Sequence, residues 1–161
     1  MKKFSIQAIL LLVVIAVGVY LYKTNGQISN LPFILQGPVF KQVQINGSKL
    51  NVEIADTKAK RSKGLSGRDS LASDSGMLFI FPGSDKHSFW MKGMLFPLDI
   101  IWIKGEIIVD ILQNVKPPAV GQTDTSLPIY QAKEAVDKVL EINAGTTQRL
   151  NIQVGDKVKL I

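Results

Sequence analysis

No other segment limits the possible folds of this chain as strongly as Leu98–Ile103, which reads LDIIWI. Branched and aromatic residues dominate the segment, and such residues favour β-strands. In a strand, Asp99 shares one side with Ile101, and Ile100 shares the other side with Trp102. Both sides are therefore apolar, as in strands that are covered on two faces. We predict that this strand lies inside the domain and that Asp99 is buried.

Short apolar segments bounded by turn residues recur through residues 39–161. Asn46-Gly47 stands between two alternating stretches, which is the pattern of a β-hairpin. These features predict a mostly-β domain, either a compact sandwich or an open barrel, with roughly seven to eight short strands and one or two short helices. We expect strands at 43–45, 50–54, 77–81, 88–92, 98–103, 107–115, 136–143 and 157–161, and helices at 57–63 and 146–150.

Residues 1–23 predict a membrane anchor. The nineteen residues Phe4–Tyr22 contain only Ser5 and Gln7 as clearly polar members. A helix of that length rises about 28 Å, close to the hydrocarbon thickness of a bilayer. Two lysines precede the segment, so its N-terminus is expected in the cytoplasm and the rest of the chain outside. We therefore predict a single-pass protein of the cell membrane, held there by a transmembrane helix at residues 4–22.

A cleaved signal peptide is the alternative for the same residues. Ala16-Val17-Gly18 offers small residues at a suitable spacing for cleavage. The apolar segment continues past that site for about another helical turn, which favours an uncleaved anchor. In either case a linker at residues 24–38 and a domain at residues 39–161 are expected to be extracytoplasmic.

Composition excludes several classes of function. Residues 24–161 carry 16 Lys and Arg against 13 Asp and Glu, a net charge of only about +3, so we do not predict a nucleic-acid partner. The basic cluster at residues 58–63 has no interleaved aromatic residues and is interpreted as a solvated helix face. The chain has no Cys and one His, so thiol catalysis and Cys/His zinc sites are excluded. We predict no metal and no cofactor.

Asp99 and Glu141 are the candidate catalytic residues. A carboxyl group among apolar neighbours has a raised pKa and can act as a general acid or base. Together with Asp110 they are the carboxylates available for glycoside hydrolysis. The structural interpretation, which we favour, is that Asp99 is held by backbone N–H groups or by a cation such as Lys92, Arg61 or Arg68.

Five residues are candidates for ligand binding: Trp90, Lys92, Arg61, Arg68 and Tyr130. The two arginines could bind an anion as a fork, although structural pairing with a carboxylate such as Asp99 or Glu141 is favoured. Trp90, Met91 and Trp102 could line a sugar- or peptide-binding surface, although core packing is favoured for them. The loop Lys116–Pro128 is longer than most connections, and such loops are often functional.

Several blocks of residues follow one another in a fixed order along the domain. They are Arg61-x-x-Gly64-Leu65-x-x-Arg68, Gly76-Met77-Leu78-Phe79-x-Phe81, Phe89-Trp90-Met91-Lys92, Pro97-Leu98-Asp99-Ile100-Ile101, Tyr130, Val139–Gly145 and Gly155–Val158. With these blocks the chain resembles the family catalogued as domain of unknown function 192, over roughly Val39–Ile161. The resemblance implies a compact β-rich fold and frequent export or membrane tethering. It implies no established activity.

The sequence therefore favours a membrane-tethered extracytoplasmic binding or accessory module without enzymatic activity. The expected ligand is an unidentified small molecule or an envelope protein, bound near Trp90, Lys92 and the loop Lys116–Pro128. One alternative is an envelope-glycan hydrolase that uses Asp99 and Glu141. Another is a structural envelope protein-interaction domain without a pocket.

Overall fold

The fold is described from a computed structural model in which residues 2–23 and 40–161 are described, with side chains at 12–23 and 40–161. The chain divides into two units, Met1–Pro38 and Val39–Ile161. The predicted linker at residues 24–38 lies outside the described residues.

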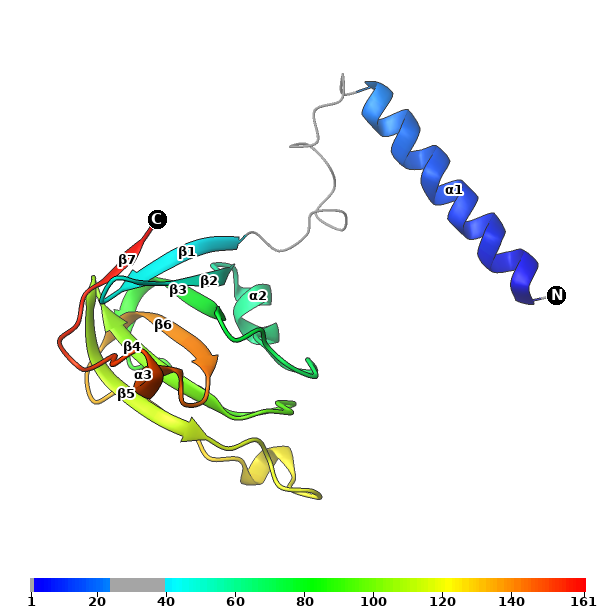
Figure 1. Ribbon diagram of the computed structural model, residues 1–161. Helices are drawn as coiled ribbons and strands as arrows, with labels where there is room; N and C mark the ends of the chain where they lie inside the picture. Colours follow the sequence, from blue (N-terminus) through cyan, green and yellow to red (C-terminus); the bar gives the residue numbers. More distant parts are fainter. Residues whose placement is uncertain (1, 24–39) are drawn as a thin grey trace. The chain divides into compact units, whose positions relative to one another are not determined.

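The N-terminal unit contains one helix, α1, over Lys2–Lys23 (Figure 1). The side chains described on it belong to residues 12–23, and Leu12, Val14 and Tyr22 are among the exposed ones. Of the helices in the described residues, none combines the length and the apolar character needed to cross a membrane. The predicted membrane anchor therefore stays a prediction.

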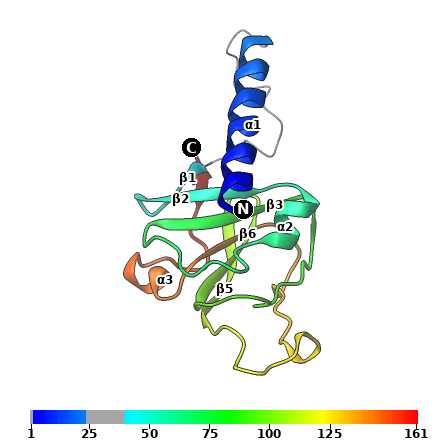
Figure 2. The same cartoon turned by 90° about the vertical axis from the view of Figure 1, so that its right-hand side faces the viewer.

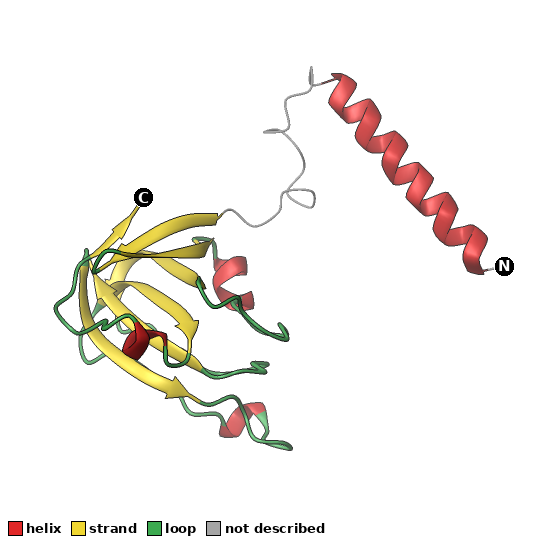
Figure 3. Cartoon of the chain, in the orientation of Figure 1, coloured by secondary structure: helices red, strands yellow, loops and turns green. Residues whose placement is uncertain are grey.

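The C-terminal unit is built on a single seven-stranded sheet, which Figure 3 shows in yellow. The predicted mostly-β fold is confirmed, but a sandwich is wrong, because all seven strands belong to one sheet. The elements are β1 (Phe40–Ile45), β2 (Ser48–Ala55), α2 (Lys58–Lys63), β3 (Ser75–Asp85), β4 (Leu98–Lys104), β5 (Ile107–Val115), the 3-10 turn η3 (Asp124–Ser126), β6 (Val136–Asn143), α3 (Thr146–Arg149) and β7 (Val158–Leu160).

The sheet curls into a half-barrel, as the views in Figures 1 and 2 show. Its strand order is β5-β4-β6-β3-β2-β1-β7, and only β2 and β3 pair in parallel. The two outermost strands approach each other, since the N–H of Val158 donates to the carbonyl of Glu106 at 2.8 Å. The N–H of Ile108 donates to the carbonyl of Asp156 at 3.0 Å. These bonds draw the two edges of the sheet together at one end.

The turn residues of the first hairpin and the residues that begin and end α2 have the conformations that the sequence predicts. Asn46 and Gly47 both have positive φ, of 50° and 80°, as the turn between β1 and β2 requires. Thr57 accepts a hydrogen bond from the N–H of Lys60 at 3.2 Å and caps α2. Gly64, at φ 49°, ends this short helix.

Two apolar clusters lie on the two faces of the sheet. The inner cluster fills the concave face, because residues from both outermost strands, Ile108 and Val158, belong to it. The outer cluster contains Trp102 from β4 and is covered by Leu65 and Met94 from the connecting segments. Strand β4 is fully buried from residue 98 to residue 103, so the predicted two-sided burial is confirmed.

One predicted strand is absent, and the predicted end of another is wrong. Residues 88–92 form no strand, and only Phe89 bridges to Tyr130, through N–H···O bonds of 2.9 and 2.8 Å. Strand β3 continues past Pro82 to Asp85, with an irregular register after Ile80. Pro82 is tolerated there because the ladder with β6 is interrupted at that point.

Candidate functional site

A pocket of about 280 Å³ opens on the outer face of the sheet. Residues of α2, of the turn that follows it, of β3 and β6, and of the segment 88–94 contribute to its walls. Its volume is near the lower end of the range for small-molecule sites, roughly 300–1000 Å³. The lining residues are Lys58, Arg61, Ser62, Lys63, Gly64, Leu65, Ser66, Phe79, Phe81, Ser88, Phe89, Trp90, Met94 and Glu141.

Aromatic side chains form one wall of this pocket. The ring of Phe89 meets the ring of Phe79 edge to face, with centroids 5.1 Å apart, and that of Phe81 at 6.3 Å. These contacts fix the orientation of the three rings. Trp90 differs from them because it is 57% exposed, so one indole surface is open to a ligand. The wall therefore combines a rigid apolar base with an accessible stacking surface.

Cationic side chains from α2 also line the pocket. The Nη1 atom of Arg61 donates to the carbonyl oxygens of Asp56 and Ile80, at 2.7 and 2.8 Å, and its guanidinium lies 5.1 Å from the centroid of the Phe81 ring. Backbone and ring thus hold one edge of the guanidinium in place. Lys58 and Lys63 also line the pocket, and neither forms an ion pair with any acid in the described part of the chain.

Glu141 is the most buried polar residue of the pocket lining, with 5% of its surface exposed. It lies on β6 between Met77 of β3 and Ile100 of β4, so its immediate neighbours in the sheet are apolar. Burial raises the pKa of its carboxyl to about 8. Within residues 40–161 its carboxyl has no hydrogen-bond partner and no ion-pair partner. Glu141 is thus an unpaired, largely buried carboxyl that lines a cavity.

Two hydrogen bonds join the walls of the pocket. The hydroxyl of Ser66 donates to the carbonyl of Lys92 at 2.7 Å, and the N–H of Gly67 donates to the carbonyl of Gly93 at 2.8 Å. Gly93 has φ 67° and approaches Ser66 closely. The turn after α2 and the segment 88–94 are therefore fastened to each other without a ligand.

Asp99 lies on the other face of the sheet and is fully buried. One carboxylate oxygen accepts from the N–H of Asn114 at 2.9 Å. The other accepts from the N–H and the hydroxyl of Thr147, at 2.9 and 2.7 Å. Of the structural interpretations given above, backbone N–H groups are the observed partners of Asp99, and none of the three cations pairs with it. The carboxylate ties β4 to β5 and α3.

The glycan-hydrolase alternative requires Asp99 and Glu141 in one site, and the two residues do not share one. Asp99 is paired with Ile142 in the sheet and Glu141 with Ile100, so the two side chains alternate to opposite faces. Asp110 contacts Lys133 at 3.3 Å and does not line the pocket that contains Glu141. A pair of carboxylates cannot flank one glycosidic bond across a sheet.

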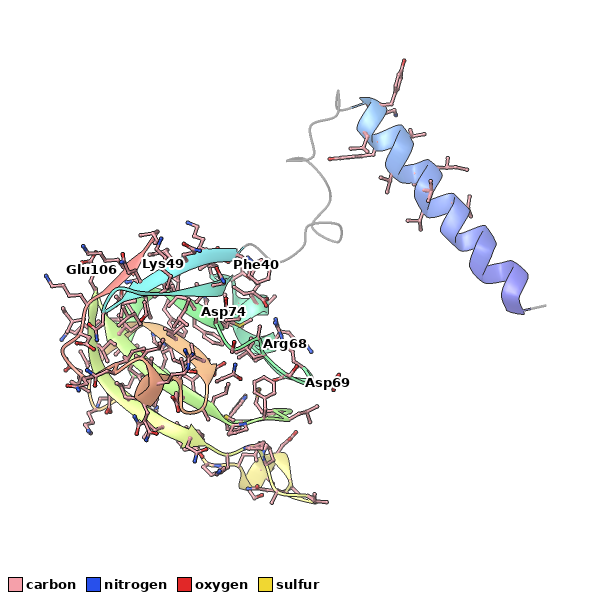
Figure 4. All side chains as sticks on the ribbon, in the orientation of Figure 1. Phe40, Lys49, Arg68, Asp69, Asp74 and Glu106 are labelled. Carbon is pink, nitrogen blue, oxygen red and sulfur yellow. The ribbon has the colours of Figure 1, made fainter. Side chains whose placement is uncertain are left out.

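The remaining candidate ligand residues separate into two groups. Arg61 and Trp90 line the pocket. Arg68, which Figure 4 labels beyond α2, forms a two-pronged ion pair with Glu53 that raises the pKa of Arg68. Lys92 pairs with Asp124 of the loop 116–128 at 2.6 Å, and neither residue lines the pocket. Tyr130, Met91 and Trp102 pack in or against the outer cluster instead.

Sequence reasoning missed a set of pocket residues. The cluster Lys58–Lys63 is a solvated helix face, as predicted, since α2 has no buried residue, but several of its residues also line the pocket with Phe79 and Phe81. A usable signal was present in the sequence. Phe79 and Phe81 share one side of a strand, and the basic helix is the preceding element, separated from β3 by residues 64–74. Among the described residues, no group of three or more His, Cys, Asp or Glu side chains could hold a metal ion.

The chain is thus a small half-barrel domain with a pocket on the outer face of its sheet. A family model matches residues 41–160, and it describes domain of unknown function 192 as an "Uncharacterized ACR". The chain belongs to this uncharacterised family, as its sequence blocks indicate.

Two solved structures are similar to the chain. One is a "putative transcription regulator" from Sinorhizobium meliloti 1021, with 32% identity and a TM-score of 0.69, covering 78% of this chain and 96% of its own. The other is a protein of unknown function from Novosphingobium aromaticivorans DSM 12444, with 30% identity and a TM-score of 0.66, covering 78% of this chain and 94% of its own. A comparison with curated proteins finds no match.

Proposed function

We propose that this protein is an extracytoplasmic binding or accessory module without catalytic activity, and that its small-molecule site is the pocket on the outer face of the sheet. The observation that carries the proposal is Glu141, a buried carboxyl without a partner in the described domain, facing a cavity between cations and aromatic rings. Buried polar groups in native proteins normally have partners, so a ligand is a direct explanation for this one.

The proposed location at the membrane rests on the sequence of the N-terminal segment. The helix α1 extends over 22 residues, or about 33 Å, and Phe4–Tyr22 within it is predominantly apolar. Residues 4–11 lie outside those with described side chains. The expected result is that the full chain stays in the membrane pellet after alkaline carbonate extraction, whereas a chain lacking residues 1–23 does not. Release of the full chain by carbonate would contradict the anchor.

The alternative of an envelope-glycan hydrolase has a weaker basis. Glu141 has the raised pKa of a general acid. The second carboxylate that glycoside hydrolysis needs does not line its pocket, because Asp99 is on the opposite face. Hydrolysis of envelope glycans that Glu141→Gln abolishes would replace the present proposal by the enzymatic one.

We do not propose a nucleic-acid ligand, although one of the similar solved structures is described as a putative transcription regulator. Arg61 is held by two backbone carbonyls, and Lys60 pairs with Asp56 at 2.9 Å. The basic side chains of α2 are thus divided between internal contacts and the pocket, instead of forming one stripe for phosphates.

The direct test is a thermal-shift screen of the full chain in detergent. The panel contains envelope glycan fragments, nucleotides, small organic acids and amines. A ligand at a hundredfold excess over its Kd stabilises the folded state by about 2.7 kcal/mol, which is several degrees for a domain of this size. Ser62→Trp, placed in the pocket lining, is expected to abolish the shift, and Ser70→Trp on the exposed turn is the matched control.

Two results would contradict the proposed site. One is the absence of any stabilising compound, which would favour the structural protein-interaction alternative and lead to crosslinking in intact membranes. The other is a shift that Ser62→Trp and Ser70→Trp preserve equally, because the compound would then bind elsewhere.

A further inference from the structure

The charge distribution in the pocket on the outer face restricts what it can bind. Lys58, Arg61 and Lys63 are the basic residues of its lining, and Glu141 is the only acidic one. The cations lie on the more exposed α2 side, whereas Glu141 is 5% exposed. A ligand would therefore meet positive charge near the entrance and a single carboxyl in the interior. This polarity favours an anionic group at the entrance.

Arg61 is prepared for such a group. Two backbone carbonyls hold its Nη1 atom, and the guanidinium carbon lies over the Phe81 ring, so the position of the group does not depend on a ligand. Its Nε and Nη2 donors form no hydrogen bond within residues 40–161. A guanidinium with one edge fixed and the other free is well suited to a carboxylate or phosphate oxygen pair.

Glu141, the interior carboxyl, requires a hydrogen-bond acceptor on the ligand. In its protonated form a carboxyl carries one O–H donor, which needs an acceptor when it is buried. The raised pKa of Glu141 means that this form predominates at neutral pH. Between the two polar ends, the exposed indole of Trp90 and the fixed rings of Phe79 and Phe89 offer surfaces to a flat or cyclic body.

We propose that the pocket binds a small cyclic organic anion, whose acidic group meets Arg61 and the two lysines of α2, and whose ring carries a hydrogen-bond acceptor toward Glu141. This inference rests on the proposed function and specifies its ligand class. Carboxylates and phosphates share the required chemistry.

The test uses compounds that share a ring and differ in charge. One series is 4-hydroxybenzoate, 4-hydroxybenzyl alcohol and tyramine, and the second is glucuronate, glucose and glucosamine. Phenyl phosphate and glucose 6-phosphate separate phosphate from carboxylate recognition. Binding to the full chain in detergent is followed by tryptophan fluorescence, because Trp90 lines the pocket and the chain has only one other tryptophan. In at least one series, an anion is expected to bind at least tenfold more tightly than its neutral and cationic analogues.

Variants assign this preference to the pocket. Arg61→Gln is expected to weaken binding of the anion at least tenfold and to leave the neutral analogue within about twofold. Arg68→Gln is the matched control, since Arg68 is paired with Glu53 and does not line the pocket. Equal losses in both variants would indicate a general loss of folding or of positive charge and would overturn the assignment.

A pH profile tests the role of Glu141 separately. The titratable groups on the elements around it include Lys58, Lys60, Arg61 and Lys63 on α2, Arg68 in the turn that follows, Asp85 at the end of β3, and Lys86, His87 and Lys92 in the segment before β4. Beside Glu141 itself, β3 and β4 place Met77 and Ile100. Ionisation of Glu141 removes the donor and adds a repelling charge, so affinity for the anion is expected to fall as pH rises through about 8. The profile should be flat in Glu141→Gln and unchanged in His87→Asn.

The outcomes separate this inference from the proposed function. A cationic or neutral analogue that binds best, and that Ser62→Trp excludes, would overturn the anion assignment and keep the pocket as a ligand site. Failure of every anion in both series to bind would also overturn the anion assignment. If no compound in the thermal-shift screen stabilises the protein, both the anion assignment and the proposed ligand site are overturned.

Discussion

The carboxylate of Asp99 accepts hydrogen bonds from both the backbone N–H and the hydroxyl of Thr147, at 2.9 and 2.7 Å. Both residues are buried, so water cannot replace either bond. This contact attaches α3, which has only four residues, to the central strand β4. A helix of that length has no stability of its own and depends on such an attachment.

Thr147→Val tests this attachment. The variant keeps the shape of the side chain and removes the hydroxyl, which also accepts from Gln113 at 3.0 Å. Because a hydrogen bond to a charged group is lost, we expect the free energy of unfolding to fall by about 2 kcal/mol. Urea denaturation followed by tryptophan fluorescence measures the change. Thr125→Val, at an exposed position in η3, is the control and should stay within about 0.5 kcal/mol of the parent.

Glu141 gives the domain a specific dependence of stability on pH. Its folded-state pKa is about 8, against an ordinary value of 4.5, so between these values the folded form keeps a proton that the unfolded chain has released. The free energy of unfolding therefore falls as pH rises through this window, by up to about 1.4 kcal/mol per pH unit. Below about pH 4.5 the carboxyl is protonated in both the folded and the unfolded state, so Glu141 does not lower the free energy of unfolding. Above about pH 8 it is ionised in both states, and the decrease in the free energy of unfolding has reached its full size.

Glu141→Gln isolates that contribution from those of the other titrating groups. The stability of the variant relative to the parent is expected to rise between about pH 5 and pH 8 and to level off above, because the amide does not ionise. Urea denaturation at several pH values measures the difference. Glu106→Gln, at an exposed position, is the control, and a parallel rise in both variants would show that Glu141 is not the source.

Gly76 marks the closest approach between β3 and β6. A Cβ atom at this position would lie 2.7 Å from the carbonyl oxygen of Glu141 and 2.8 Å from a methyl carbon of Ile142. The backbone cannot withdraw without breaking the ladder, so Gly76→Ala is expected to cost about 1–3 kcal/mol of unfolding free energy. Gly83→Ala is the matched control, because nothing lies within 4 Å of its Cβ position. Equal midpoints of urea denaturation for the two variants would contradict the close approach.

Arg68 and Arg61 are expected to behave differently, although both were candidate ligand residues. Arg68→Lys removes the two-pronged geometry with Glu53, and because the pair is partly exposed we expect a loss of only about 1 kcal/mol. The loss should shrink in high salt, and ligand binding should not change. Denaturation at low and high ionic strength measures the first effect. A salt-independent loss would show that packing, and not charge, is what Arg68 supplies.

The sequence was sufficient for most of the fold. Alternation around Asn46-Gly47 predicted the first hairpin, and the doubly apolar segment 98–103 predicted the buried central strand, because both patterns are local. The predicted strand at 88–92 was wrong for a related reason. Its apolar residues pack against the outer cluster from a loop, and local patterns do not distinguish that burial from burial in a strand.

The candidate site was harder to predict, because it depends on which face of the sheet each residue occupies. Asp99 was expected to be buried, and it is; Glu141, the other candidate catalytic carboxyl, is buried as well. Their opposite faces follow from the pairing of β4 with β6, in which Asp99 opposes Ile142. That register joins segments some forty residues apart, and no local pattern specifies it. The pocket between α2 and residues 88–94 is a tertiary feature for the same reason.

The position of Glu141 on β6 has a consequence for how this strand pairs. Its neighbours Leu140 and Ile142 belong to the inner cluster, while its own side chain faces outward. A shift of β6 by one residue would exchange the two faces and place a carboxyl in the apolar interior of the half-barrel. In the observed register the carboxyl borders the pocket, whereas the shifted register would enclose it among apolar side chains, at a cost of several kcal/mol. The carboxyl that we assign to ligand recognition therefore also disfavours a register of β6 shifted by one residue.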